Sequence, residues 1–214
     1  MLGRSACDSC GGVIAPWDLV PILSWLLLRG RCRRCGAAID RRHPAVELAG
    51  AAVAVASVLA HPLPEAALTA LLGWVLLLIA MLDLDHHWLP DKLTLPLLGL
   101  GLAAAAAARF GPSFADRLVG AVAGYLTLYL ISKVYLRLRG REGLGGGDPK
   151  LFAAIGAWLG WQALPLVMLG AGCAGLAAVL LQRLQGRPVA ATDRLPLGTL
   201  MALVAWPAWL VSAA

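Results

Sequence analysis

The feature that most constrains this chain is a series of long apolar segments separated by short polar ones. Residues 151–182 form a stretch of 32 residues without a single charged side chain. A membrane span needs about 20 mainly apolar residues. Across the 214 residues, 60% are hydrophobic and 14% are charged, whereas soluble domains have about 45–50% and about 25%. The composition excludes a disordered chain and favours an all-α, polytopic membrane protein over a soluble enzyme.

Seven segments are candidates for membrane spans, because each is apolar over roughly the length of a spanning helix. The long uncharged stretch is divided near Gly160, where glycine and proline favour a turn. The predicted spans cover residues 45–60, 66–83, 93–109, 116–136, 150–163, 165–183 and 195–213. Glu47 is expected at the interface or against protein, since a charge exposed to lipid is costly.

The positive charges predict the orientation in the membrane. If residues 1–44 face the cytoplasm and the spans alternate, the cytoplasmic side holds 16 of the 18 Lys and Arg residues, and the outer side holds only Arg109 and Arg117. Positively charged loops stay in the cytoplasm, so we expect a cytoplasmic N-terminus in the inner membrane. The net charge of +6 then orients the chain in the lipid bilayer and does not indicate a nucleic-acid partner.

Four of the five cysteines form two CxxC pairs: Cys7 with Cys10, and Cys32 with Cys35. Two such pairs, each on a tight turn, complete a tetrahedral four-sulfur site that suits structural zinc. Disulfides are the alternative, which the reducing cytoplasm opposes. We expect residues 1–44 to form a cytoplasmic zinc-binding module and residues 45–214 a transmembrane domain. Cys173, inside an apolar segment, is expected to serve packing.

Two aspartates, Asp83 and Asp148, lie at ends of predicted spans that the orientation puts at the inner membrane surface. Ionisable groups at membrane depth are candidates for function. Two facing carboxyl groups can share one proton and activate a water for attack on a peptide bond. Asp148, at a helix N-terminus, is expected to ionise more readily, and Asp83, at a helix C-terminus, is expected to carry the proton.

Other interpretations of these acidic residues stay open. Asp148 also fits an ordinary helix N-cap, and Asp91 fits the cap of the third span. Asp85 competes with Asp83 for the catalytic position, and Asp83 is preferred because it lies nearer the apolar segment. A transporter or an assembly scaffold, with these aspartates as ion-pathway or capping residues, is the alternative function.

Several segments of the sequence resemble the prepilin peptidases, also called type IV leader peptidases, a family of membrane-embedded aspartic proteases. Residues 83–96, DLDHHWLPDKLTLP, resemble the segment around the family's first catalytic aspartate. Residues 145–150, GGGDPK, fit its GxGD motif, which carries the second. Residues 20–35 and 43–48 resemble its cysteine-rich cytoplasmic loop. The likeness runs from about Cys7 to the last predicted span.

The resemblance implies that Asp83 and Asp148 are the catalytic pair of an enzyme that removes the basic leader from type IV prepilins or type II secretion pseudopilins. It also implies N-methylation of the new N-terminus with S-adenosylmethionine, with a peptidase lacking this second activity as the alternative. The family usually has a further transmembrane helix before the cysteine module. Here the chain begins almost at Cys7, so we expect either a mis-assigned start or a shortened member.

Overall fold

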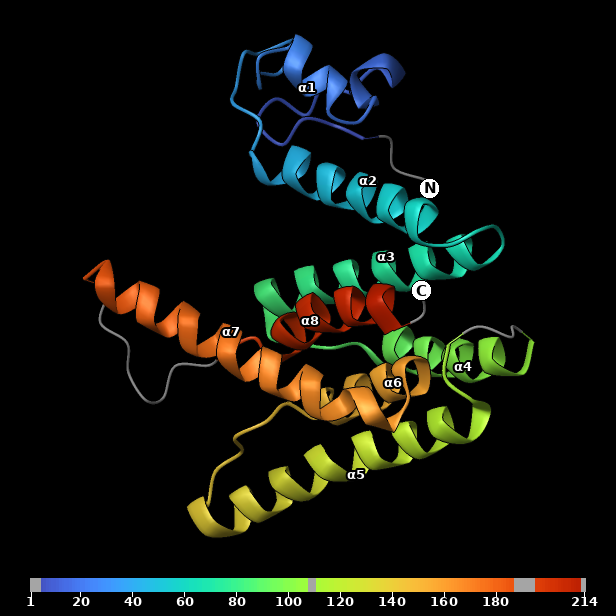
Figure 1. Cartoon of the computed structure of the whole chain (residues 1–214). Helices are drawn as coiled ribbons and strands as arrows, with labels where there is room; N and C mark the ends of the chain where they lie inside the picture. Colours follow the sequence, from blue (N-terminus) through green and yellow to red (C-terminus); the bar gives the residue numbers. More distant parts are fainter. Residues whose placement is uncertain (1–4, 108–110, 187–194, 213–214) are drawn as a thin grey trace. The chain divides into compact units, whose positions relative to one another are not determined.

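The structure, a computed structural model, describes residues 5–107, 111–186 and 195–212. In these residues every regular element is a helix, apart from two isolated β-bridges (Figure 1). The all-helical fold class is therefore confirmed. The chain divides into two compact units, Met1–Val55 and Ala56–Ala214.

The first unit is built from tight turns and short helices. It contains η1 (Pro16–Leu19), α1 (Leu23–Leu27) and the beginning of α2 (Arg42–Ala60). Among its described residues, no hydrophobic side chain before Val53 is buried. The carboxylate of Glu47 accepts a hydrogen bond from the backbone N–H of Ile22 at 2.7 Å, so this acid meets protein, as expected. Residues 5–52 thus lack an apolar core of their own.

The remaining helices form the second unit. They are α3 (Glu65–His86), α4 (Asp91–Ala107), α5 (Phe114–Arg139), α6 (Asp148–Leu159), η2 (Trp161–Ala163), α7 (Leu164–Leu184) and α8 (Leu197–Ser212). Together with α2, the α-helices fall on the seven predicted segments. Gly160, with φ +76°, ends α6 where the turn was expected. The predicted span ends at 108–109 and 213 lie outside the described residues.

Not every helix of the structure is long enough to cross a membrane. Within the described residues, four helices are long and apolar enough to cross a membrane: α2, α3, α5 and the continuous segment Trp161–Leu184. Helix α8 is apolar but shorter, and α6 has only 12 residues, fewer than a span needs. The predicted count of seven spans is therefore not confirmed.

Helix α6 is the centre of the second unit, because it packs against α4, α5, α7 and α8 (Figure 1). A Cβ added at Gly156 would collide with the backbone of Gly120 in α5, so these glycines allow the two helices to approach closely. On another face, the fully buried Trp158 donates its Nε1–H to the carbonyl of Leu97 in α4 at 2.8 Å. These contacts fix the helix that begins with Asp148.

Helix α3 lies beside α8 (Figure 1). Buried leucine and isoleucine side chains of α3 share one apolar cluster with Met201 and Trp209 of α8. A hydrogen bond marks each end of the pair: Trp209 donates to Thr69 Oγ1 at 3.1 Å, and Thr199 Oγ1 donates to the carbonyl of Ala80 at 2.9 Å. This packing brings the last turn of α3, which contains Asp83, to the first turn of α8.

Candidate active site and cysteine cluster

Asp83 is held at the start of α8, although it belongs to α3. The residue is buried, with 5% of its surface exposed. Its Oδ2 accepts the backbone N–H of Thr199 at 2.8 Å and lies 3.2 Å from Thr199 Oγ1. A Cβ at Gly198 would lie 3.0 Å from the same oxygen, so a glycine there leaves room for the carboxylate. Among the described residues, Oδ1 of Asp83 has no hydrogen-bond partner.

Asp148 is the first residue of α6 and is also buried, with 7% of its surface exposed. Its Oδ2 accepts the backbone N–H of Gly145 at 2.9 Å. The N-cap position is taken by Gly147, and no side chain caps the helix. The carboxylate therefore bonds back to the glycine loop, and the interpretation of Asp148 as an ordinary N-cap is wrong.

The three glycines before Asp148 have unequal surroundings. A Cβ at Gly147 would lie 2.5 Å from the Cβ of Leu89, and a Cβ at Gly145 would lie 3.2 Å from Asp148 Oδ2. A Cβ at Gly146 would meet nothing within 4 Å. The first and third glycines therefore allow the loop to lie against its neighbours, whereas the middle one has open space.

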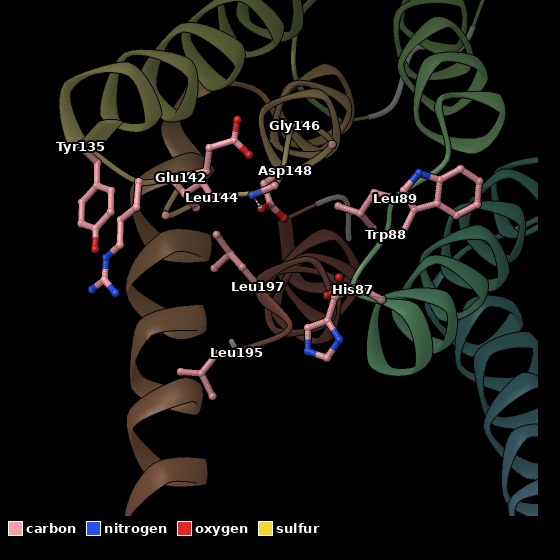
Figure 2. A pocket seen from close by; sticks show the side chains of 15 residues that line it. His87, Trp88, Leu89, Tyr135, Glu142, Leu144, Gly146, Asp148, Leu195 and Leu197 are labelled. Carbon is pink, nitrogen blue, oxygen red and sulfur yellow. Dashed lines mark hydrogen bonds between the residues drawn. The ribbon is translucent and has the colours of Figure 1, made fainter. Parts of the chain in front are cut away.

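The two aspartates line one cavity of about 760 Å³ in the second unit. In Figure 2 the carboxylate of Asp148 points toward the space between Leu197, Leu89 and His87. The two carboxyl groups are close enough for their charges to interact. The cavity is lined by charged, glycine and apolar residues: Asp83, His87, Trp88, Leu89, Tyr135, Arg141, Glu142, Gly143, Leu144, Gly145, Gly146, Gly147, Asp148, Leu195 and Leu197.

The other acidic candidates lie away from this cavity. Asp85 is exposed and is not among the lining residues. Asp91 begins α4, and both of its carboxylate oxygens accept hydrogen bonds from Lys150 Nζ, at 2.6 and 2.7 Å. Of the acidic residues considered from the sequence as catalytic, the structure brings Asp83 and Asp148 together and leaves Asp85 apart.

Sequence reasoning missed the contribution of α8 to the site. Thr199 donates to Asp83, Gly198 makes room for it, and Leu197 lines the cavity. The only local signal is a glycine before an apolar helix, which does not reveal a partner 116 positions earlier. His87 was also missed as a lining residue, and Cys173 is exposed on α7 rather than packed inside, contrary to expectation.

The four cysteines of the first unit form a single cluster. Their Sγ atoms all lie within 4.8 Å of one another, and Cys7 Sγ lies 3.9 Å from Cys35 Sγ. Each CxxC pair sits on a turn of the same design, in which the first cysteine accepts the N–H of the glycine four residues later. Those glycines, Gly11 and Gly36, have φ angles of +63° and +72°, which glycine adopts readily. The cluster could hold one metal ion.

Titration of the thiols also favours a bound cation. Hydrogen bonds from the backbone N–H groups of Cys35 and Arg34 lower the pKa of the Cys32 thiol to about 6. The backbone N–H of Ala37 acts in the same direction on Cys35, but burial and hydrogen bonds with the other thiols raise its pKa to about 11. Without a cation, one thiolate in the cluster opposes formation of the next. A metal ion would stabilise all four thiolates at neutral pH.

The chain was compared with known proteins. Residues 70–180, which contain both aspartates, match the model of the type IV leader peptidase family. The chain belongs to the type IV leader peptidase family. Residues 1–61, which contain the four clustered cysteines, match the bacterial peptidase A24 N-terminal domain. The resemblance drawn from the sequence motifs is thus confirmed, and the apolar helices together with this family identify a membrane protein.

Several curated relatives named prepilin leader peptidase/N-methyltransferase are similar over most of the chain. The relative from Burkholderia pseudomallei is 46% identical over 93% of this chain and 64% of its own length. Those from Aeromonas hydrophila and Pseudomonas aeruginosa are 43% and 42% identical, each over 98% of this chain and 72% of its own length. The chain therefore spans about two thirds of the length of these relatives. No solved structure gives a significant match.

Proposed function

We propose that this protein is a membrane-embedded aspartic endopeptidase that removes the basic leader from type IV prepilins or type II secretion pseudopilins. The observation that carries this proposal is the pair of buried carboxylates, Asp83 and Asp148, that line one cavity. The names of the relatives supply the substrate class. We take these two aspartates as the catalytic residues.

The proposed chemistry needs one ionised and one protonated carboxyl group. The ionised carboxylate takes a proton from a water molecule while the water oxygen bonds to the carbonyl carbon of the scissile peptide. The protonated carboxyl group donates its proton to the carbonyl oxygen. When the tetrahedral intermediate collapses, the C–N bond breaks and the carboxyl group that took the water proton gives it to the leaving nitrogen. The other carboxylate takes the proton of one hydroxyl of the intermediate, so the pair again holds one proton. Within the described part of the chain the Oδ1 atoms of Asp83 and Asp148 accept no hydrogen bond, and they suit these proton transfers, because the Oδ2 atoms are engaged by backbone N–H groups.

The lining of the cavity suits a substrate whose polarity changes at the cut. Arg141 and Glu142 give it charged groups, while Leu195 and Leu197 give it apolar ones. A prepilin would present a basic leader from the cytoplasm and an apolar helix from the membrane. In the proposed topology, with a cytoplasmic N-terminus in the inner membrane, the cut falls at the cytoplasmic face. If all seven predicted segments cross the membrane, the division of Lys and Arg between the two sides supports this orientation.

We further propose that the cysteine cluster binds one structural zinc ion in a cytoplasmic module of residues 1–44. Zn–S bonds of about 2.3 Å in a tetrahedron put the sulfurs roughly 3.8 Å apart, close to the 3.9 Å between Cys7 and Cys35. Cys10 and Cys32 supply the other two ligands. Because thiolates would occupy all four positions, the ion would stabilise the fold and would not act on a substrate.

N-methylation of the new N-terminus with S-adenosylmethionine is the second activity that we propose. It rests on the name that the relatives carry, since no residue of this chain is assigned to the methyl donor. Incubating the purified protein with a prepilin and isotope-labelled S-adenosylmethionine tests it directly. Cleaved but unlabelled product would identify a peptidase without this activity.

Cleavage itself is tested with purified protein and a type IV prepilin, with the shortened product followed by mass spectrometry. We expect wild-type protein to release the leader, and Asp83→Asn and Asp148→Asn each to lower the rate by about a hundredfold or more. Asp85→Asn, on the same helix but exposed, is the matched control and should cleave at nearly the wild-type rate. Absence of any wild-type product would favour a scaffold or transporter, and loss of activity only in Asp85→Asn would overturn the assignment of Asp83.

A further inference from the structure

One contact that the proposed chemistry does not yet use joins Thr199 to Asp83. Thr199 is 5% exposed and is not among the residues that line the cavity. It reaches Asp83 from the first turn of α8 with its backbone N–H at 2.8 Å and its hydroxyl at 3.2 Å. A residue that touches a catalytic group without reaching the substrate cavity can act only through that group.

The hydroxyl of Thr199 also bonds within α3. Its Oγ1 lies 2.9 Å from the carbonyl oxygen of Ala80, which precedes Asp83 by three residues. Thr199 therefore contacts both the carboxyl side chain and the backbone of the helix that carries it. Because Oδ2 is held by the backbone N–H and the hydroxyl of Thr199, the Asp83 side chain has few orientations.

The first turn of α8 also affects the charge of Asp83. The N–H groups at the start of a helix have no partner within the helix, and this end of the helix favours a nearby negative charge. Gly198 permits the close approach, since a Cβ there would lie 3.0 Å from Asp83 Oδ2. For comparison, the Asp148 carboxylate has one hydrogen-bond donor among the residues that the structure describes, the backbone N–H of Gly145.

We propose that Thr199 is a positioning residue that orients Asp83 and keeps it as the ionised member of the pair, so that Asp83 takes the proton from water and Asp148 carries the proton. This inference rests on the proposed peptidase function. It reverses the assignment expected from the helix ends, because the start of α8 supplies Asp83 with the donors that the end of α3 lacks.

Other charged groups near Asp83 must be considered in any pH-dependent test. No titratable side chain lies in the first turn of α8. Asp91 of α4 and Lys150 of α6 pair with each other. The titratable side chains that line the cavity with Asp83 come from the end of α3, from α5, from the loop before α6 and from the start of α6: His87, Tyr135, Arg141, Glu142 and Asp148. All of these remain unchanged when only Thr199 is substituted.

The test is the pH profile of prepilin cleavage by wild-type protein, Thr199→Val and Thr199→Ser. The single hydroxyl hydrogen of Thr199 is shared between the Ala80 carbonyl at 2.9 Å and Asp83 Oδ2 at 3.2 Å. Thr199→Val removes this hydrogen and keeps the backbone N–H, and kcat should fall by about tenfold. KM should stay within roughly twofold, because Thr199 does not reach the cavity. Thr199→Ser keeps Oγ and should restore the wild-type rate. Thr94→Val, which removes another buried hydroxyl, bonded only to a backbone carbonyl, is the matched control.

The limb of the pH profile that moves identifies the ionised residue. If Asp83 is the first of the pair to ionise, the acidic limb reports on it, and losing a donor moves that limb to higher pH in Thr199→Val. If Asp148 ionises first, the basic limb moves instead, which would overturn the assignment of charge. Equal kcat in Thr199→Val and wild type would overturn the positioning role.

Two further controls keep the result interpretable. If Thr199→Val does not purify as a folded protein, Thr199→Ala removes the same hydroxyl without putting a methyl group in its place and carries the same expectation. Wild-type cleavage in the same assay separates this inference from the proposed function. If wild type cleaves and no Thr199 variant differs from it, only the inference fails.

Discussion

The cysteine cluster and the aspartate pair both bring distant residues together, but they are built by opposite means. In the first unit, two turns of the same local design present the four sulfurs, and no hydrophobic side chain before Val53 is buried among the described residues. In the second unit, the site depends on helix packing, including a hydrogen bond between residues 116 positions apart. Local sequence determines the first site, and tertiary packing determines the second.

Removing the metal should give the largest effect that distinguishes the two units. A four-cysteine zinc site contributes an apparent binding free energy of about 10–16 kcal/mol at pH 7, and residues 1–41 have no apolar core to replace it. We expect a strong chelator, or Cys32→Ser, to make these residues sensitive to protease. The helices of the second unit should keep their circular dichroism signal. Zinc content by mass spectrometry should fall from one ion per chain to none.

The matched control is Cys173→Ser, which removes an exposed thiol outside the cluster and should change neither zinc content nor protease sensitivity. If the chelated protein resisted protease as well as the untreated one, the first unit would be held by something other than metal. Melting of the second unit on chelation would mean that the two units do not fold by separate means.

The same difference decides what could be predicted from the sequence. The CxxC spacing and the following glycines predicted the cluster, because each cysteine pair is presented by a hydrogen bond within its own short turn. The lengths of the apolar segments also predicted the positions of the helices. The end of α6 at Gly160 was predicted as well, but apolarity alone did not show that the 12-residue helix is shorter than a membrane span. Thr199 was missed because its role depends on where α8 packs against α3.

Glycine substitutions should lower stability less than metal removal does. Glycine allows close packing in the second unit and an unusual backbone conformation in the first. Gly147→Ala would put a Cβ 2.5 Å from the Cβ of Leu89, and such overpacking costs about 1–3 kcal/mol. We expect lower thermal stability and slower cleavage, since the shifted loop displaces Asp148. Gly146→Ala, with nothing within 4 Å, should stay within about 0.5 kcal/mol of wild type.

In the first unit, glycine is required for its backbone conformation and not because neighbouring atoms leave no room for a side chain. Gly36 has φ +72° and nothing within 4 Å of an added Cβ, so Gly36→Ala should cost about 1–2 kcal/mol through backbone conformation alone. Thermal unfolding and zinc affinity measure this cost. If Gly146→Ala lowered cleavage as much as Gly147→Ala, packing against Leu89 would not be what positions Asp148, and the contrast between the two units would be weakened.

The smallest effect concerns the ion pair of the first unit, which tests whether polar contacts share the role of the metal. Arg33 Nη2 donates to Asp18 Oδ1 at 2.7 Å, and hydrogen bonds from Arg33 hold the pKa of Asp18 below its ordinary value. A lowered pKa means that the pair stabilises the fold above about pH 4, the ordinary value for an aspartate. The contribution is lost as the pH falls through the lowered pKa of Asp18.

We therefore expect Arg33→Gln to raise the pKa of Asp18 toward its ordinary value, as measured by carbon NMR titration of the Asp18 carboxyl group. The zinc-loaded unit should keep nearly its wild-type stability at pH 7, because exposed ion pairs contribute little. An unchanged Asp18 titration would mean that the pair does not form in solution. If Arg33→Gln instead exposed residues 1–41 to protease as fully as chelation does, the four sulfurs would not be sufficient to hold this unit, and its stability would depend on side-chain contacts, as that of the helical unit does.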